Sequence, residues 1–233
     1  MCKNVWKVAK LQLKNISAAY IATAIATAAM SIQYIIDLVF KLNGDSTENI
    51  GISFTWGLLL LPVLAAIIIP ARNFRRTMNL GGKRGNFIYG CMMGYAALSF
   101  ATALAGTIID YTFTQSVIDS GVYGGIWTPM SVFGWAAYGP VAALFQQFAF
   151  LLVASLLAHT LSAAQGRWYG FTADIAIIAI ICVFTPIENL RTLLAGFFYL
   201  IMFAAAPVQI AACLIIALAV FTLSKPIFAR KVI

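Results

Sequence analysis

Long apolar stretches alternate with short polar segments along the whole chain. A helix needs roughly 20 apolar residues to cross a hydrocarbon layer about 30 Å thick. On this criterion the pattern predicts an all-α membrane protein with six transmembrane helices, and we expect the spans near residues 17–40, 53–71, 87–112, 134–162, 171–187 and 207–224. We therefore expect one transmembrane domain over residues 1–233, without a separate water-soluble domain.

The region before the last predicted span is too long for one ordinary crossing, and it is interrupted by Pro207. Two full crossings here would place the basic C-terminal end on the outer side, against the charge pattern described below. We therefore predict a re-entrant or interfacial outer segment at residues 191–205, followed by the final span. One long tilted helix with a kink at Pro207 is the alternative.

The first 16 residues predict an amphipathic helix. The spacing of its lysines places them on one narrow helical face, with small and apolar residues roughly opposite. This pattern is typical of an interfacial helix whose apolar face sinks among acyl chains while its cations face anionic headgroups. The membrane-surface residues predicted in this way are Lys3, Lys7, Lys10 and Lys14.

Composition and charge agree with a location in the bilayer. Hydrophobic residues make up 62% and charged residues 9% of the chain, whereas soluble domains have about a quarter charged residues. Cytosolic termini, together with cytosolic loops at 72–86 and 163–170, collect every Lys and Arg except Lys41 and Arg191 on the inner side. The positive-inside rule therefore predicts a multi-pass protein with both termini in the cytoplasm.

The densest basic cluster lies between the second and third predicted spans. After Pro70, residues 71–82 are expected to form a short helix that stops at Gly81 and Gly82. Phe74 and Met78 lie four residues apart and are expected to form an apolar ridge, flanked by arginines, that fits a groove on a cytosolic protein. Simple anchoring to anionic lipid headgroups is the alternative. The candidate docking residues are Arg72, Phe74, Arg75, Arg76, Met78 and Leu80.

Catalytic chemistry has little support in the sequence, so we expect the chain not to be an enzyme. The four cysteines form no CxxC pair, and the glycines before Lys83 do not fit the Walker pattern. The single histidine, His159, is either a proton relay or substrate contact, or a structural polar residue within the bundle. Asp37 and Asp110 either form a pair or lie as solvated acids at helix ends. We expect neither a metal site nor a bound cofactor.

Residues 74–90, with the sequence FRRTMNLGGKRGNFIYG, resemble a pattern in permeases of bacterial ABC exporters. Related segments have an aromatic residue and Arg, then Leu-Gly, a small residue, a basic residue and an aromatic residue that opens the third span. This group is the second ABC-transporter permease superfamily, or type V exporters, and includes small exporters of drugs and of peptides such as phenol-soluble modulins. The entry helix, the six-span layout and the broken region before the last span extend the resemblance over most of the chain.

The resemblance implies a permease in the bacterial plasma membrane that pairs with a second transmembrane subunit, as a homodimer or heterodimer. Two separate cytosolic ATPases would bind ATP and Mg, with no cofactor on this chain. The segment from Arg72 to Leu80 would be the coupling helix, residues 1–16 the elbow helix, and the cargo an amphipathic peptide or hydrophobic small molecule. No nucleic-acid partner is expected.

Polar side chains inside the predicted spans indicate where a substrate path could lie, because a polar group in hydrocarbon is energetically costly unless it faces protein or water. We predict that Gln33, Gln146 and Gln147 approach a dimer interface, since small residues nearby allow close helix contact.

Two other functions remain open from the sequence. One is a secondary transporter or channel driven by an ion gradient, and the other is a non-catalytic membrane anchor of a cytosolic complex.

Overall fold

The computed structural model describes residues 2–42, 50–119, 125–165 and 168–230, and most of them are helical. The long helices are α1 (Cys2–Lys14), α2 (Ser17–Leu42), α3 (Thr55–Ile68), α5 (Arg84–Ile109), α8 (Gly139–Ala164), α9 (Trp168–Phe184), α10 (Glu188–Met202) and α11 (Ala206–Arg230). The shorter elements are β1 (Ile50–Ile52), η1 (Ile69–Asn73), α4 (Phe74–Asn79), η2 (Asp110–Thr114), α6 (Gln115–Asp119), β2 (Gly125–Trp127), α7 (Pro129–Val132) and η3 (Trp135–Tyr138).

The helices are long and apolar enough for a multi-pass membrane protein. Within the described residues, continuous helical segments that could cross a bilayer are Thr55–Asn79, Arg84–Thr114, Trp135–Ala164 and Ala206–Phe228. Two further pairs pass the same test but are bent, by 50° between α1 and α2 and by 119° between α9 and α10. The all-α prediction is therefore confirmed, with four to six candidate spans among these residues.

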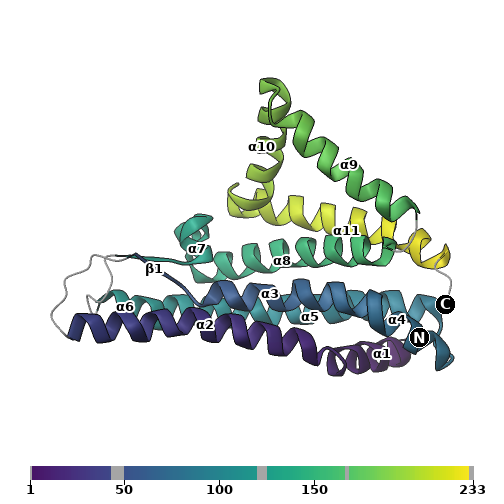
Figure 1. The fold of residues 1–233 in the computed structure, drawn as a ribbon, viewed down its shortest axis with the longest axis horizontal. Helices are drawn as coiled ribbons and strands as arrows, with labels where there is room; N and C mark the ends of the chain where they lie inside the picture. The colour runs from purple at the N-terminus through teal and green to yellow at the C-terminus, as the bar shows by residue number, and fades with distance from the viewer. Residues whose placement is uncertain (1, 43–49, 120–124, 166–167, 231–233) are drawn as a thin grey trace.

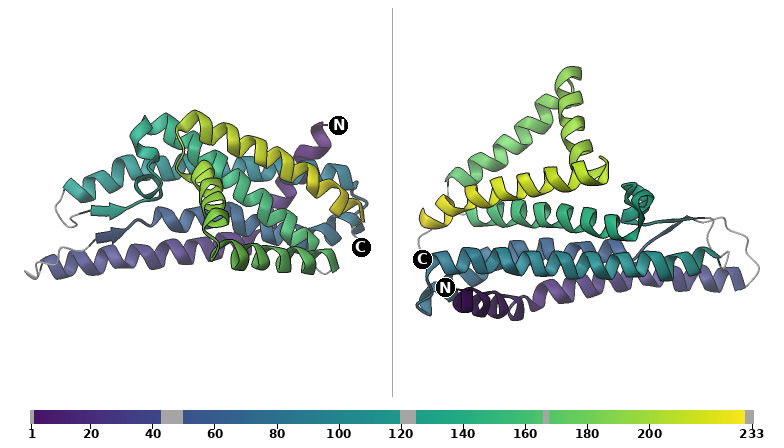
Figure 2. Two further views of the ribbon diagram at one scale, coloured as in Figure 1. Left: turned by 90° about the horizontal axis from the view of Figure 1, so that it is seen from above. Right: turned by 180° about the vertical axis from the view of Figure 1, so that it is seen from behind.

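The core lies between four long helices. Helix α8 packs against α3, α5 and α11, while α2 runs along the outer side of α3 (Figures 1 and 2). Large apolar and aromatic side chains from α5, α8 and α11 meet in this core, including Phe87, Tyr95, Leu156 and Phe228. Helix α1 begins and α11 ends near the same end of the bundle (Figure 1), close to α4.

Helix α1 packs against α5, so the prediction that its apolar face sinks among acyl chains is wrong. Val5 and Ala9 are buried, and the thiol of Cys91 on α5 donates a hydrogen bond to the Gln12 side chain at 3.2 Å. Burial against another helix is possible because Gly90 has no side chain at the crossing. The described lysine side chains, of Lys7, Lys10 and Lys14, are exposed as predicted, whereas the Lys3 side chain lies outside the described part.

The opposite end of the bundle contains a small parallel sheet that the sequence did not predict. Strand β1 pairs with β2 in the register Ile50 with Gly125 to Ile52 with Trp127, and Ser53 N donates to Trp127 O at 3.0 Å. After β2, the Thr128 and Ser131 side chains form a capping box that begins α7. The described part of the 113–133 region is thus largely regular.

Helices α9 and α10 form an arm that stands away from the other helices (Figures 1 and 2). Residues 203–205 separate α10 from α11, and Pro207 lies in the first turn of α11, where a missing backbone N–H costs little. The Trp135 indole donates to Met202 O at 2.8 Å, which fixes the end of α10 against the bundle. The predicted break before the last span is confirmed, and the alternative of one long kinked helix is wrong.

The crossing of α2 and α3 depends on Gly57. A Cβ atom at this position would lie 2.8 Å from Thr27 Oγ1 and 2.9 Å from Thr27 N, so the α2 backbone would have to move. We expect Gly57→Ala to destabilise the bundle by about 1–3 kcal/mol, as overpacking does elsewhere. Thermal unfolding in detergent, monitored by tryptophan fluorescence, measures the change.

Gly94→Ala is the matched control for this prediction, because its Cβ would meet only Leu13, at 3.7 Å and beyond, in ordinary contact. Equal melting temperatures for the two variants would contradict the close crossing of α2 and α3.

Candidate functional site

The arginine-bearing segment is a continuation of the second span, and the prediction of a separate helix after Pro70 is wrong. Helix α3 passes without a break through the π-helical turn η1 into α4. Pro70 lacks an N–H group and would clash within a regular α-helical turn, and the wider π turn accommodates it. The Thr77 hydroxyl donates to Asn73 O at 2.8 Å and links η1 to α4.

The end of this segment follows the prediction from its two glycines. Gly81 has a φ of +78°, which a side chain strongly disfavours, and its N–H donates to Met78 O at 2.9 Å. A Cβ atom at Gly82 would lie 2.7 Å from Thr77 O, so this position also requires glycine. The chain then turns directly into α5 at Arg84.

The apolar ridge of this segment faces the bundle core, so its predicted role in docking a partner is wrong. Phe74 is 1% exposed and Met78 is 9% exposed. The Phe74 ring centroid lies 5.2 Å from that of Phe87 on α5 and 5.3 Å from that of Phe228 on α11. Phe74 thus joins α4 to α5 and α11.

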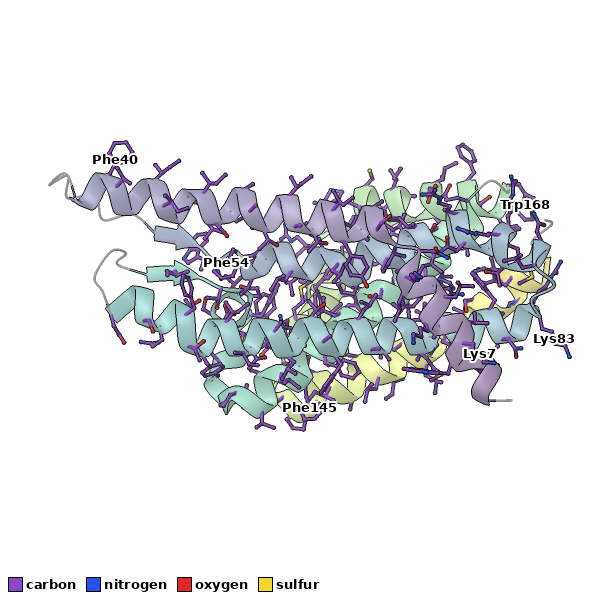
Figure 3. The ribbon with its side chains drawn as sticks, turned by 90° about the horizontal axis from the view of Figure 1, so that it is seen from below. Lys7, Phe40, Phe54, Lys83, Phe145 and Trp168 are labelled. Atoms are coloured by element: carbon purple, nitrogen blue, oxygen red, sulfur yellow. The ribbon has the colours of Figure 1, made fainter. Side chains whose placement is uncertain are left out.

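The opposite face of the same segment is cationic and exposed. Arg72, Arg75 and Arg76 all project from it, and Leu80 follows at the tip with 73% of its surface exposed. Lys83 lies beyond the glycine turn, and Figure 3 shows it at the same end of the molecule as Lys7 and Trp168. The segment therefore presents a basic surface carrying one apolar side chain. We call Arg72, Arg75, Arg76 and Leu80 the basic tip.

A polar pair lies in the core behind the basic tip. The Tyr95 hydroxyl and His159 Nδ1 are 2.7 Å apart, and the His159 ring stacks on Phe228 at a centroid distance of 5.0 Å. His159 is 2% exposed. This environment fits the structural reading of the histidine, as a polar residue bonded within the bundle. Arg84 Nη1 also donates to Phe228 O at 3.4 Å, which ties the start of α5 to α11.

The three glutamines of the predicted substrate path do not come together. Gln33 is exposed on α2, whereas Gln146 and Gln147 are buried on α8. Gln146 Nε2 donates to Gln209 Oε1 at 2.6 Å, and Gln209 Nε2 donates to Ile201 O at 2.9 Å. This chain of bonds joins α8 to α11 and α10, a role typical of polar residues within helix bundles.

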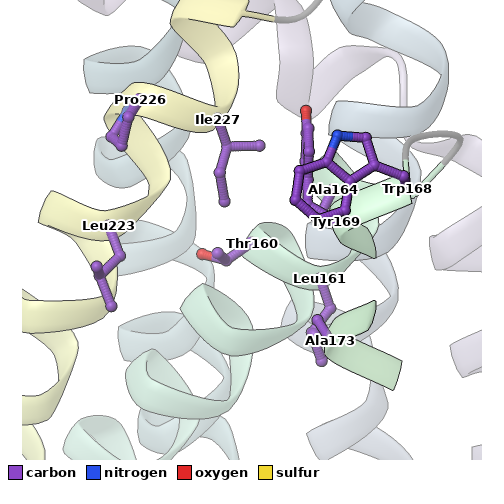
Figure 4. Close-up of a pocket in the computed structure, with 9 residues that line it drawn as sticks. All are labelled: Thr160, Leu161, Ala164, Trp168, Tyr169, Ala173, Leu223, Pro226 and Ile227. Atoms are coloured by element: carbon purple, nitrogen blue, oxygen red, sulfur yellow. The ribbon is translucent and has the colours of Figure 1, made fainter. Parts of the chain in front are cut away.

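An apolar cavity of about 510 Å³ opens between α8, α9 and α11. Figure 4 shows Trp168 and Tyr169 of α9 on one side and Leu223, Pro226 and Ile227 of α11 on the other. Residues of α8, including Thr160 and Leu161, complete the lining. Nearly all of this lining is apolar, so it suits a hydrocarbon group rather than a charged ligand.

Among the described residues, no three His, Cys, Asp or Glu side chains gather closely enough to hold a metal ion. Asp110, for which the sequence left open a pair with Asp37 or a solvated position at a helix end, lies at the end of α5 but is buried beside Ser53. The Asp37 side chain lies outside the described part. The sequence could not predict this position of Asp110, because Ser53 follows β1 and the pairing of β1 with β2 has no periodic signal in the sequence.

Comparisons with protein-family models, curated proteins and solved structures found no match for the chain.

Proposed function

We propose that this chain is the permease subunit of an ATP-driven exporter. Separate cytosolic ATPase subunits would hydrolyse ATP with Mg, and the permease would move an amphipathic peptide or a hydrophobic small molecule across the bilayer. The observation that carries the proposal is the basic tip, an exposed cationic surface built on the end of a membrane span.

A coupling element must bind its partner on one side and be rigidly attached to the moving bundle on the other. The basic tip offers arginine guanidinium groups, which bind carboxylates in a defined planar geometry, and Leu80 as an apolar contact. Behind it, the Phe74 ring is held by Phe87 and Phe228. A displacement of the tip by an ATPase would therefore be transmitted to α5 and α11 together.

The same orientation fits the charge pattern. Helix α1, the basic tip and the end of α11 lie at one end of the bundle (Figure 1), and each carries basic residues. With this end in the cytoplasm, the arrangement satisfies the positive-inside rule in a bacterial plasma membrane. The arm of α9 and α10 would then face lipid or a second permease subunit with its exposed apolar side chains.

The test is to purify the chain in lipid nanodiscs with a candidate ABC ATPase, taken from a neighbouring gene or recovered from the native membrane. We expect a stable complex whose ATP hydrolysis exceeds that of the ATPase alone, because docking at the basic tip orders the motor subunits. The ATPase alone and the permease alone are the controls. Failure to recover any nucleotide-hydrolysing companion, from the neighbouring gene or by affinity purification from the native membrane, would overturn the proposal.

A further inference from the structure

Asp110 lies at the end of the bundle opposite the basic tip, where α5 passes into η2. Asp110 is buried, with 9% of the residue's surface exposed. Ser53 Oγ donates to Asp110 Oδ1 at 3.4 Å, and Thr114 Oγ1 donates to the same oxygen at 3.5 Å. Figure 3 shows the neighbouring Phe54 at the end of the molecule far from Lys83.

The second carboxylate oxygen of Asp110 has no hydrogen-bond partner among the described residues. No Lys or Arg belongs to the described lining of the pocket that Asp110 borders, so nothing there balances a negative charge. A buried carboxylate is paired, coordinates a cation or takes up a proton, because an unpaired charge away from water is costly. The hydroxyl groups around Asp110 and the pocket beside it favour the cation, and direct measurement of ion binding distinguishes it from a proton.

The groups hydrogen-bonded to Asp110 Oδ1 are hydroxyls, and oxygen atoms are the ligands that hard cations prefer. Thr55 Oγ1 is 2.7 Å from Ser53 Oγ, so three hydroxyl groups adjoin one carboxylate. The distances of 3.4 Å and 3.5 Å from Asp110 Oδ1 are long for O–H···O bonds. They match the spacing of neighbouring oxygens at right angles around an ion with metal–oxygen distances of about 2.4 Å.

A route from solvent is present beside the carboxylate. A pocket of about 170 Å³ is bordered by Asp110 and Thr114 and continues past Thr128 to the exposed side chains of Gln115 and Ser131. Most of its lining surface is apolar, so a partly hydrated ion would be held at its polar edge by Asp110 together with Thr114 and Thr128. With one carboxylate and neutral hydroxyls, the site balances a single positive charge, whereas calcium sites generally use several carboxylates.

We propose that Asp110, Ser53 and Thr114 bind a sodium ion, with the Thr55 hydroxyl hydrogen-bonded to Ser53. The ion would join the connection between β1 and α3 to the end of α5, and it would thereby hold the small sheet against the bundle. This inference does not depend on an ATPase partner, so it can fail or succeed independently of the proposed exporter function.

The test uses the full chain in nanodiscs, without any ATPase, and measures binding of radioactive ²²Na⁺ together with thermal unfolding. In the wild-type chain we expect saturable binding, and saturating sodium should raise the melting temperature by about 5 °C over choline chloride. Potassium should have a smaller effect because it is larger than the oxygen spacing allows. Asp110→Asn should bind sodium at least tenfold more weakly, and Thr114→Val should also weaken binding.

Asp119→Asn is the matched control, because Asp119 is an exposed acid on the adjoining helix α6. This variant should retain both sodium responses. A wild-type chain that neither binds ²²Na⁺ nor responds to sodium would overturn the proposal. Equal sodium binding by wild type and Asp110→Asn would also overturn it, and would leave Asp110 with a purely structural role beside the start of α3. Choline melting curves show separately whether Asp110→Asn folds.

Discussion

Phe74→Ala is expected to lower the free energy of unfolding of the bundle by about 3–5 kcal/mol, the usual cost of removing a buried phenylalanine. Phe74 is 1% exposed, and its ring contacts those of Phe87 and Phe228 from two other helices. The truncation would leave a void where three helices meet, and edge-to-face ring contacts would be lost as well. Reversible unfolding by increasing SDS in mixed micelles measures the change.

Leu80→Ala is the control, because Leu80 belongs to the same segment but is 73% exposed. This substitution should change the free energy of unfolding by less than about 0.5 kcal/mol. The opposite pattern, with a stable Phe74→Ala bundle that no longer binds an ATPase, would restore Phe74 as a docking residue. Phe74→Asp is a poor test of docking, because a buried unpaired charge would prevent folding.

The sequence predicted the helical class and the positions of the four continuous candidate spans, because hydrocarbon thickness imposes a length that apolar runs reveal directly. The stop at Gly81 and Gly82 was also predictable, since glycine is needed where φ is positive or the backbone is crowded. These features depend on local chemistry alone.

The direction in which the ridge of Phe74 and Met78 faces could not be predicted in this way. Arginines alternating with apolar residues fit a helix that docks on a partner, and they fit equally a helix end packed on its own bundle. The position of Phe228 decides between them, and this residue is distant in the sequence. The partner of the apolar face of helix α1 was equally unpredictable from local sequence. Its contacts with Gly90 and Cys91 on α5 show that this face meets protein instead of lipid.

The largest functional effect is expected from reversing the charge of the basic tip. In the triple variant Arg72→Glu, Arg75→Glu and Arg76→Glu, we expect the affinity for the ATPase to fall at least about 100-fold, and stimulated ATP hydrolysis to be lost. Reversing charges at an interface leaves like charges opposed, and losses of about 3 kcal/mol or more per interface are typical. Pull-down and ATPase assays in nanodiscs measure both effects.

A change in overall charge alone would weaken binding to any acidic partner. The control must therefore alter the same number of charges elsewhere at this end of the bundle. The triple variant Lys7→Glu, Lys10→Glu and Lys14→Glu does so on the exposed face of α1. Because Phe74 and Met78 anchor the tip from its buried side, the arginine variant should keep the wild-type melting temperature. If both triple variants lost the same affinity for the ATPase, the attraction would come from the overall positive charge of this end. The ATPase would then have no specific binding site on α4 through which to move the bundle.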